Sequence, residues 1–213
     1  MIGKRKIFEL YRDSSFILRA YLRIKLKICP LIMLEEYFPK GGTIVDLGCG
    51  NGLFPNILSL GSLERRIIGL DLDEKKIKVA NQTKSLDSHI TYQLGDIVEA
   101  KYPRGDVLTL VDVLYLIPYD KEELVLKKCY QSLSEDGTLI IKEMDTQPRW
   151  KYTYNLFQET LAVKLIRFTL GERFFFRSKE DYLEILSKIG FSVKPIHLHS
   201  GYWYPHIAFI CTK

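Results

Sequence analysis

The chain has few of the features that mark secreted, disulfide-bonded or membrane-spanning proteins. Its 213 residues include only four cysteines, which lie far apart and form no C-x-x-C pair. This spacing argues against a disulfide framework and favours reduced thiols. No run of about eighteen apolar residues occurs, so no membrane-spanning segment is predicted. The basic N-terminus also lacks the uninterrupted apolar stretch of a secretory signal. We therefore expect a cytoplasmic protein.

A strong excess of one charge is also missing. The chain carries 31 basic and 26 acidic residues, for a net charge of +5. This mild excess permits an acidic partner but does not require one, and no RNA-binding module is evident. Hydrophobic residues make up 46% of the chain, enough to bury a sizeable core. We expect a single domain over residues 1–213 and no nucleic-acid partner.

Short apolar runs alternate with amphipathic helical patterns from Thr43 onward. Strands are predicted over 43–48, 66–72, 89–96, 106–114, 137–145, 191–199 and 206–213, and helices over 53–60, 73–86, 121–133 and 178–190. Near-continuous β-branched runs separated by helices are typical of a parallel sheet covered on both faces. The pattern predicts a doubly wound α/β fold with seven mostly parallel strands, in which the last two form a hairpin at the sheet edge.

Two segments lie outside this alternation, and we expect both to pack over the carboxyl ends of the strands. Residues 1–40 predict an N-terminal helical cap with a wide apolar face (Ile17, Tyr21, Ile24 and Ile28, widened by Leu18, Leu22 and Leu26) beside a basic stripe (Arg19, Arg23 and Lys27). Residues 150–177, rich in aromatics, predict a helical lid inserted after the fifth strand. The basic stripe suits either solvent or, through residues 4–28, an anionic membrane surface.

The stretch "VDLGCGNG", Val45 to Gly52, is the densest motif. A phosphate-binding loop would continue with lysine and a hydroxyl residue, but Leu53 and Phe54 follow. A dinucleotide motif would need a glycine at position 53. Asp46, two residues before the first glycine, would repel a pyrophosphate and attract an ammonium. The motif therefore points to a cationic nucleoside without phosphates.

Five stretches in this order resemble the class I S-adenosylmethionine-dependent methyltransferases: "VDLGCGNG", "IIGLDLD", "LGDIVE", "DVLTLVDVLYLIP" and "LSEDGTLIIKEMD". The resemblance implies S-adenosylmethionine as cofactor, S-adenosylhomocysteine as product, and no metal. Asp71 would take the ribose hydroxyls, Asp96 the adenine amino group, and Asp112 would approach the methionine end. The implied cofactor-binding residues are Asp46, Gly48, Cys49, Gly50, Asp71, Leu72, Asp96, Ile97 and Asp112.

The acceptor side is less defined. Enzymes that methylate amides or nucleobase amines typically carry an [ND]-P-P-[YF] tetrad after the fourth strand, and this chain has "DVLYLIPY" instead. Similar families that read D-V-L-H-H-L-P methylate small molecules, but Tyr115 replaces their first histidine here. Glu143 and Asp145 should point the same way after the fifth strand. His206 follows Pro205 among aromatic residues. Tyr115, Glu143 and His206 are the candidate catalytic residues.

The resulting expectation is a methyltransferase that acts on oxygen or carbon of a small, hydrophobic or aromatic acceptor. Two alternatives stay open: an RNA methyltransferase, and a lipid or quinone methyltransferase that works at a membrane surface. A non-catalytic binding module is disfavoured because every cofactor position is present. His197 and His199 share a strand face, but no third ligand is evident, so no metal site is expected.

Overall fold

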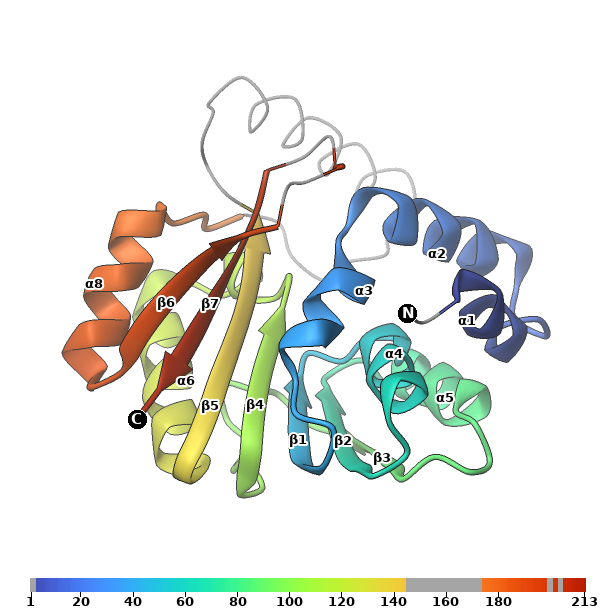
Figure 1. Ribbon diagram of the computed structural model, residues 1–213, viewed down its shortest axis with the longest axis horizontal. Coiled ribbons are helices and arrows are strands. Elements are labelled where there is room, and N and C mark those ends of the chain that lie inside the picture. The colour runs from blue at the N-terminus through green and yellow to red at the C-terminus, as the bar shows by residue number, and fades with distance from the viewer. Residues whose placement is uncertain (1–2, 145–173, 199–200, 203–204) are drawn as a thin grey trace.

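The computed structural model describes residues 3–144, 174–198, 201–202 and 205–213, which build an α/β fold around one seven-stranded sheet (Figure 1). The strand order is β3-β2-β1-β4-β5-β7-β6. The bounds are β1 Gly42–Leu47, β2 Arg65–Asp71, β3 Ile90–Leu94, β4 Gly105–Val111, β5 Leu133–Met144, β6 Ser192–His197 and β7 His206–Thr212. The first five strands are parallel, and β7 runs antiparallel between β5 and β6. The predicted sheet and edge hairpin are confirmed.

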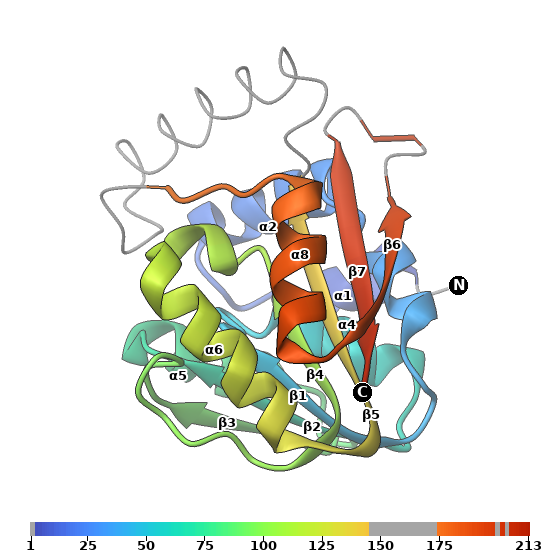
Figure 2. The same ribbon diagram turned by 90° about the vertical axis from the view of Figure 1, so that its left-hand side faces the viewer.

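Helices cover both faces of the sheet (Figures 1 and 2). One face carries α1 Lys4–Leu10, α2 Phe16–Ile28, α3 Leu31–Leu34, α4 Leu53–Gly61 and α5 Glu74–Thr83, and the other carries α6 Tyr119–Ser132 and α8 Lys179–Ile189. Short 3-10 turns lie at η1 Glu35–Tyr37 and η2 Leu114–Leu116. Successive strand residues point to opposite faces, so Ile44 joins the core under α1–α4 and Val45 joins the core under α6 and α8.

The helix boundaries follow the local signals in the sequence. The Asp73 carboxylate accepts hydrogen bonds from the amides of Lys75 and Lys76 and so begins α5. Ser178 and Asp181 form the predicted capping box at the start of α8. Gly190 ends α8 with a φ of 116°, a backbone conformation that favours glycine. These residues determine where α5 begins and where α8 begins and ends.

The N-terminal helical cap is present, but its buried face is narrower than predicted. In α2, the residues Leu18, Leu22 and Leu26 are buried, whereas 62% of Ile17 and 59% of Ile24 are exposed. Only one side of α2 joins the core cluster that also contains Ile7. The predicted apolar face is therefore buried only in part: Tyr21 and Ile28 pack against this cluster, whereas Ile17 and Ile24 face outward. Helix α2 lies above the carboxyl ends of the strands, as expected (Figure 1).

The predicted lid over 150–177 lies mostly outside the described residues, which resume at Phe174 in an extended segment that leads into α8. Asp145, one of the paired acids after the fifth strand, also falls outside them. None of the helices within the described ranges has the length and apolar content that a bilayer crossing requires.

Candidate functional site

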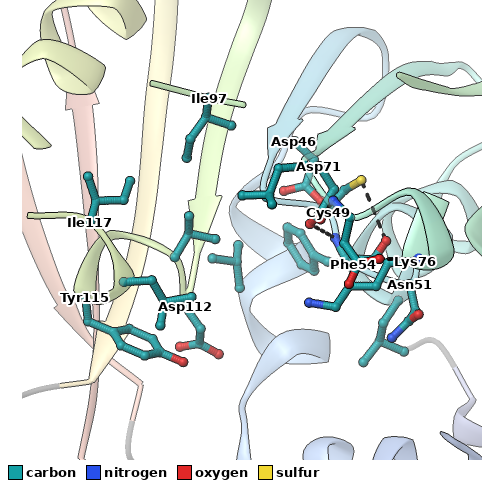
Figure 3. A pocket seen from close by; sticks show the side chains of 18 of the residues that line it. Asp46, Cys49, Asn51, Phe54, Asp71, Lys76, Ile97, Asp112, Tyr115 and Ile117 are labelled. Carbon is teal, nitrogen blue, oxygen red and sulfur yellow. Dashed lines mark hydrogen bonds between the residues drawn. The ribbon is translucent and has the colours of Figure 1, made fainter. Parts of the chain in front are cut away.

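A cavity of about 390 Å³ lies at the carboxyl ends of β1 to β4, under α2. Such a position is where open α/β sheets bind ligands. The structure brings together all nine residues predicted to bind the cofactor: Asp46, Gly48, Cys49, Gly50, Asp71, Leu72, Asp96, Ile97 and Asp112 all line the cavity. Tyr115 lines it too, beside Asp112 and across from Asp46 and Asp71 (Figure 3).

The glycine loop after β1 needs its glycines for backbone conformation and for space. Gly48, Gly50 and Gly52 have φ values of 81°, 54° and 76°, which side chains rarely adopt. A Cβ at Gly48 would lie 2.5 Å from a methyl carbon of Val113, and one at Gly52 would lie 2.4 Å from the Tyr92 hydroxyl oxygen. The loop is therefore packed tightly against the turn after β4 and against β3.

Asp71 ends β2 and holds the glycine loop through its carboxylate. Its Oδ2 accepts a hydrogen bond from the Gly50 amide at 2.8 Å, and its Oδ1 accepts one from the Asp73 amide at 2.9 Å. Each carboxylate oxygen can accept a second hydrogen bond. Because Asp71 lines the cavity, those remaining acceptor positions suit a pair of vicinal hydroxyls.

Asp46 lies beneath the glycine loop and is only 2% exposed. Burial, reinforced by the nearby Asp71 carboxylate, raises the pKa of Asp46 to about 8. An uncompensated carboxyl in such a place favours a cation as partner. Its location at the end of β1 thus suits the ammonium of a bound amino acid moiety. Burial also raises the pKa of the Cys49 thiol, which keeps this neighbour uncharged.

The end of the cavity near β3 is more open. Asp96 is exposed, and its Oδ1 accepts a hydrogen bond from the Val98 amide at 2.8 Å. Ile97 next to it is buried, and Leu72 is 54% exposed. An exposed carboxylate beside an apolar side chain suits a flat, amino-substituted ring. The donors and acceptors along the cavity therefore fit the cofactor that the sequence implies, part by part.

The opposite end contains a buried ion cluster around Asp112. Lys25 of α2 approaches Asp112 Oδ2 with its Nζ at 2.6 Å, and Lys142 of β5 contacts Oδ1. Burial opposes ionisation here, but Lys142 and Lys25 outweigh it and hold the pKa of Asp112 well below its usual range. Asp112 has a φ of 55°, uncommon for a side-chain-bearing residue and typical of functional turns.

Glu143 and His206 do not line the cavity. The Glu143 Oε1 accepts hydrogen bonds from the amides of Val113 at 3.1 Å and Leu114 at 2.9 Å. His206 is 5% exposed, and its Nε2 lies 2.8 Å from the Ile28 carbonyl oxygen, to which it donates. Burial lowers the pKa of His206 to about 3, so the ring is neutral. Both residues support the turn and helix that border the cavity, and their catalytic roles stay predictions.

Tyr115 joins an aromatic cluster at the cavity mouth. Its ring stacks on Phe176 with centroids 5.1 Å apart and contacts Phe174 at 5.7 Å. The Phe175 amide donates to the Tyr115 carbonyl at 2.8 Å. The segment before α8 is thereby attached to the turn after β4. An apolar, aromatic rim at this place suits an aromatic or hydrophobic ligand.

Sequence reasoning missed the two lysines of the ion cluster. Lys142 directly follows the apolar run "LII" of β5 and is 1% exposed. A lysine inside a buried strand needs a partner, so this position was the available signal. Lys25 had no comparable signal, because it lies among other basic residues of α2. Within the described ranges, no group of three or more histidine, cysteine or acidic side chains is placed to hold a metal ion.

Comparison with known proteins gives a family and several relatives. A family model described as an O-methyltransferase domain matches residues 15–192. Mitochondrial ubiquinone biosynthesis O-methyltransferases of Rattus norvegicus and Bos taurus are 28% and 31% identical over 176 and 178 residues. These matches cover 77% of this chain but only 50% and 46% of the two relatives. The chain thus spans about half the length of these relatives.

Solved structures share the architecture. The magnesium protoporphyrin IX methyltransferase of Synechocystis, with bound S-adenosylhomocysteine, aligns with a TM-score of 0.68 at 17% identity and covers 99% of this chain and 94% of its own. An O-methyltransferase family 2 protein of Planctomyces limnophilus, in complex with apigenin, aligns with a TM-score of 0.70 at 17% identity and covers 94% of this chain and 61% of its own. At these identities the likeness shows the fold alone.

Proposed function

The chain belongs to the O-methyltransferase domain family, a group of S-adenosylmethionine-dependent methyltransferases, and on that premise we propose that it methylates an oxygen of a small, aromatic or hydrophobic acceptor. One observation carries the proposal: nine residues from four separate strand ends surround a single cavity. Their chemistry changes along it, from Asp96 and Ile97 through Asp71 to the glycine loop and Asp46. That order matches an adenine, a ribose and a methionine moiety in turn.

Each of these residues would have a separate role in binding or transfer. S-adenosylmethionine, when bound, supplies a methyl group attached to a sulfonium sulfur. An acceptor oxygen can attack the methyl carbon in line with the carbon–sulfur bond, and the sulfur leaves as a thioether. Asp71 would hold the ribose, and Asp46 would face the ammonium. The glycine loop lets the backbone approach the methionine part without side chains. Catalysis then consists largely of holding the acceptor oxygen about 3 Å from the methyl carbon. Tyr115 and the aromatic rim would orient the acceptor ring.

Binding of S-adenosylhomocysteine tests the cofactor site directly. We expect isothermal titration calorimetry to show one site per chain. Asp71→Asn should weaken this binding roughly 100-fold, because about 3 kcal/mol of charged hydrogen bonds to the ribose is lost. Asp87→Asn is the matched control, since Asp87 is exposed on the loop before β3 and does not line the cavity. Absence of binding by the unmodified protein would refute the proposed activity.

The acceptor class rests on the lining at the other end of the cavity. Tyr21, Leu22, Leu116 and Ile117 give this end an apolar side, Tyr115 adds an aromatic ring, and Lys25, Asp112 and Lys121 also line the cavity. Such a lining favours a small apolar acceptor over an RNA strand, which needs a basic groove along its backbone. The relatives named for ubiquinone biosynthesis and the neighbour bound to apigenin support an aromatic, hydroxylated acceptor.

A lipid-like acceptor at a membrane surface is a second candidate, and one observation favours it. On α2, Phe16 is 76% exposed, and Ile17 and Ile24 are more than half exposed. The basic residues Arg23 and Lys27 are exposed on the same helix, and Arg19 is half-buried. Apolar and basic side chains on one helix surface suit the interface of an anionic membrane. The opposite side of α2 covers the cavity, so a lipid could reach the site there.

We place the protein in the cytoplasm, where its free, buried cysteines would stay reduced.

A further inference from the structure

The ion cluster beside the cavity contains two ammonium groups but a single carboxylate partner. Lys25 and Lys142 approach different oxygens of the same Asp112 side chain. Lys142 is 1% exposed and lies behind the cavity, whereas Lys25 lines the cavity itself. The Cys29 thiol also donates to Asp112 Oδ2, at 3.4 Å. Both oxygens of Asp112 therefore have partners, and Lys25 shares its only described charged partner with a second lysine.

The other titratable groups packed around this cluster do not balance its charge. His206 is held neutral by burial. Burial also raises the pKa of Glu143 to about 8, so this carboxyl stays largely protonated near neutral pH. Burial raises the pKa of the Cys29 thiol in the same way. The described cluster thus has two positive charges against one negative charge. A surplus charge removed from water is costly unless an anion completes it.

The carboxylate of the cofactor has a different place to bind. Helix α4 has no side-chain cap, and its first-turn amides at Leu53 and Phe54 lack intrahelical acceptors. Both residues line the cavity directly after the glycine loop. The helix start carries partial positive charge, which favours a carboxylate there. The surplus charge at Lys25 is therefore left for the second substrate.

We propose that Lys25 binds an anionic oxygen of the methyl acceptor, and that the enzyme selects acceptors that enter as phenolates. This inference rests on the proposed function. Lys25 borders the cavity next to Asp112 and Tyr115, at the end remote from Asp96. Lys142 is a positioning residue, because it shares Asp112 with Lys25 and leaves the Lys25 ammonium partly uncompensated. The site requires no histidine at position 115, since the positive charge itself favours loss of the phenol proton.

The transfer step balances without a further reactant. On binding, the phenol releases its proton to solvent and becomes a phenolate paired with Lys25. The phenolate oxygen attacks the methyl carbon, so an oxygen–carbon bond forms as the carbon–sulfur bond breaks. The bonding pair returns to sulfur, which becomes the neutral thioether of S-adenosylhomocysteine. The product ether carries no charge, so its attraction to Lys25 is lost and its release is favoured.

A chromogenic phenol tests this inference without turnover. We expect the protein saturated with S-adenosylhomocysteine to bind 4-nitrophenol as its phenolate, in a buffer below the pKa of the free phenol. The phenolate absorbance should then rise and saturate with protein concentration. Lys25→Met should weaken this binding roughly tenfold or more, and Lys25→Arg should retain most of it. Lys27→Met, an exposed lysine on the same helix, is the matched control and should behave like the unmodified protein.

Each outcome decides between explanations. No rise in phenolate absorbance with the unmodified complex, or an equal rise with Lys25→Met, would overturn the inference. A loss of S-adenosylhomocysteine affinity in Lys25→Met, with unchanged affinity for 5′-methylthioadenosine, would assign Lys25 to the cofactor carboxylate instead. Thermal melting checks that each variant is folded. Failure of S-adenosylhomocysteine to bind at all would refute the proposed function, whereas normal binding without a phenolate signal refutes only the role of Lys25.

Discussion

Glu143 shows how one buried side chain shapes the acceptor end of the site. Its Oε1 accepts both backbone hydrogen bonds that begin the η2 turn, at Val113 and Leu114. Its Oε2 is buried and has no hydrogen-bond partner among the residues that the structure describes. Burial raises the pKa of Glu143 to about 8 from an ordinary value of 4.5. Near neutral pH the carboxyl is therefore largely protonated and accepts these bonds without a buried charge. The side chain thus positions the turn that carries Tyr115.

The raised pKa predicts a pH dependence of stability. Between pH 4.5 and 8, the unfolded chain releases the Glu143 proton and the folded chain keeps it. The stabilisation is therefore complete below this window and is lost as the pH rises through it. Glu143→Gln mimics the protonated form. The difference in free energy of unfolding between this variant and the unmodified protein should therefore grow by about 2 kcal/mol, in favour of the variant, as the pH rises from 6 to 8. Urea unfolding at both pH values measures this difference.

A parallel pH dependence in the two proteins would contradict the assignment of this proton to Glu143. Part of the slope that remains in Glu143→Gln over the same window is expected to come from Asp46, whose pKa burial also raises to about 8. The double variant Glu143→Gln with Asp46→Asn should lose that part. It should keep a slope of opposite sign up to about pH 6.5 from His206, which burial keeps neutral in the folded chain and which is protonated in the unfolded chain.

At the scale of elements, the N-terminal helices brace the glycine loop. Tyr11, immediately after α1, donates its hydroxyl hydrogen to the Asn51 carbonyl at 2.9 Å. The Asn56 side-chain amide of α4 donates to the same hydroxyl oxygen at 3.0 Å. Tyr11 is 1% exposed, and its bond with Asn56 is buried. A segment that precedes the sheet in sequence thereby fixes the loop on which the cofactor would rest.

Removing this brace should affect both stability and binding. We expect Tyr11→Phe to lower the free energy of unfolding by about 1 kcal/mol and to weaken S-adenosylhomocysteine binding about three- to tenfold. The loss follows because the part-buried Asn51 carbonyl is left without the Tyr11 donor. Tyr37→Phe, at a position that is 40% exposed, serves as control and should change neither quantity. A drop in stability with unchanged affinity would show that the loop holds its shape without Tyr11.

At the scale of the whole molecule, the local parts of the site were predictable and the assembled parts were not. The glycine loop, Asp71 and Asp96 each follow a strand within a short motif, so their convergence followed from the parallel sheet. The ion cluster joins residues 25, 112 and 142, which only the tertiary fold brings together. For the same reason, the sequence did not show which part of the apolar face of α2 is buried. Both of its apolar stripes have helical spacing, and only packing decides which one is covered.

The exposed apolar side chains on the outward side of α2 lead us to predict that the protein binds anionic membranes. In cosedimentation, we expect the protein to bind vesicles of phosphatidylcholine with phosphatidylglycerol more strongly than vesicles of phosphatidylcholine alone. Phe16→Ser should weaken this binding roughly tenfold, because burial of one large apolar side chain is lost. Leu86→Ser removes an apolar residue that is fully exposed on the loop before β3 and should leave binding unchanged. Equal binding by both variants would exclude α2 as the contact.

The contact between Gly48 and Val113 has a consequence for enzyme engineering. Because a Cβ at Gly48 would collide with the Val113 methyl groups, the glycine loop and the turn after β4 cannot be altered independently at these two positions. Libraries designed to broaden the acceptor range should therefore keep Val113 and vary Tyr115, Leu116 and Ile117. These three residues line the cavity, and none of them supplies the atoms nearest to a Cβ at Gly48. The acceptor range and the cofactor affinity of this scaffold can then be selected as separate traits.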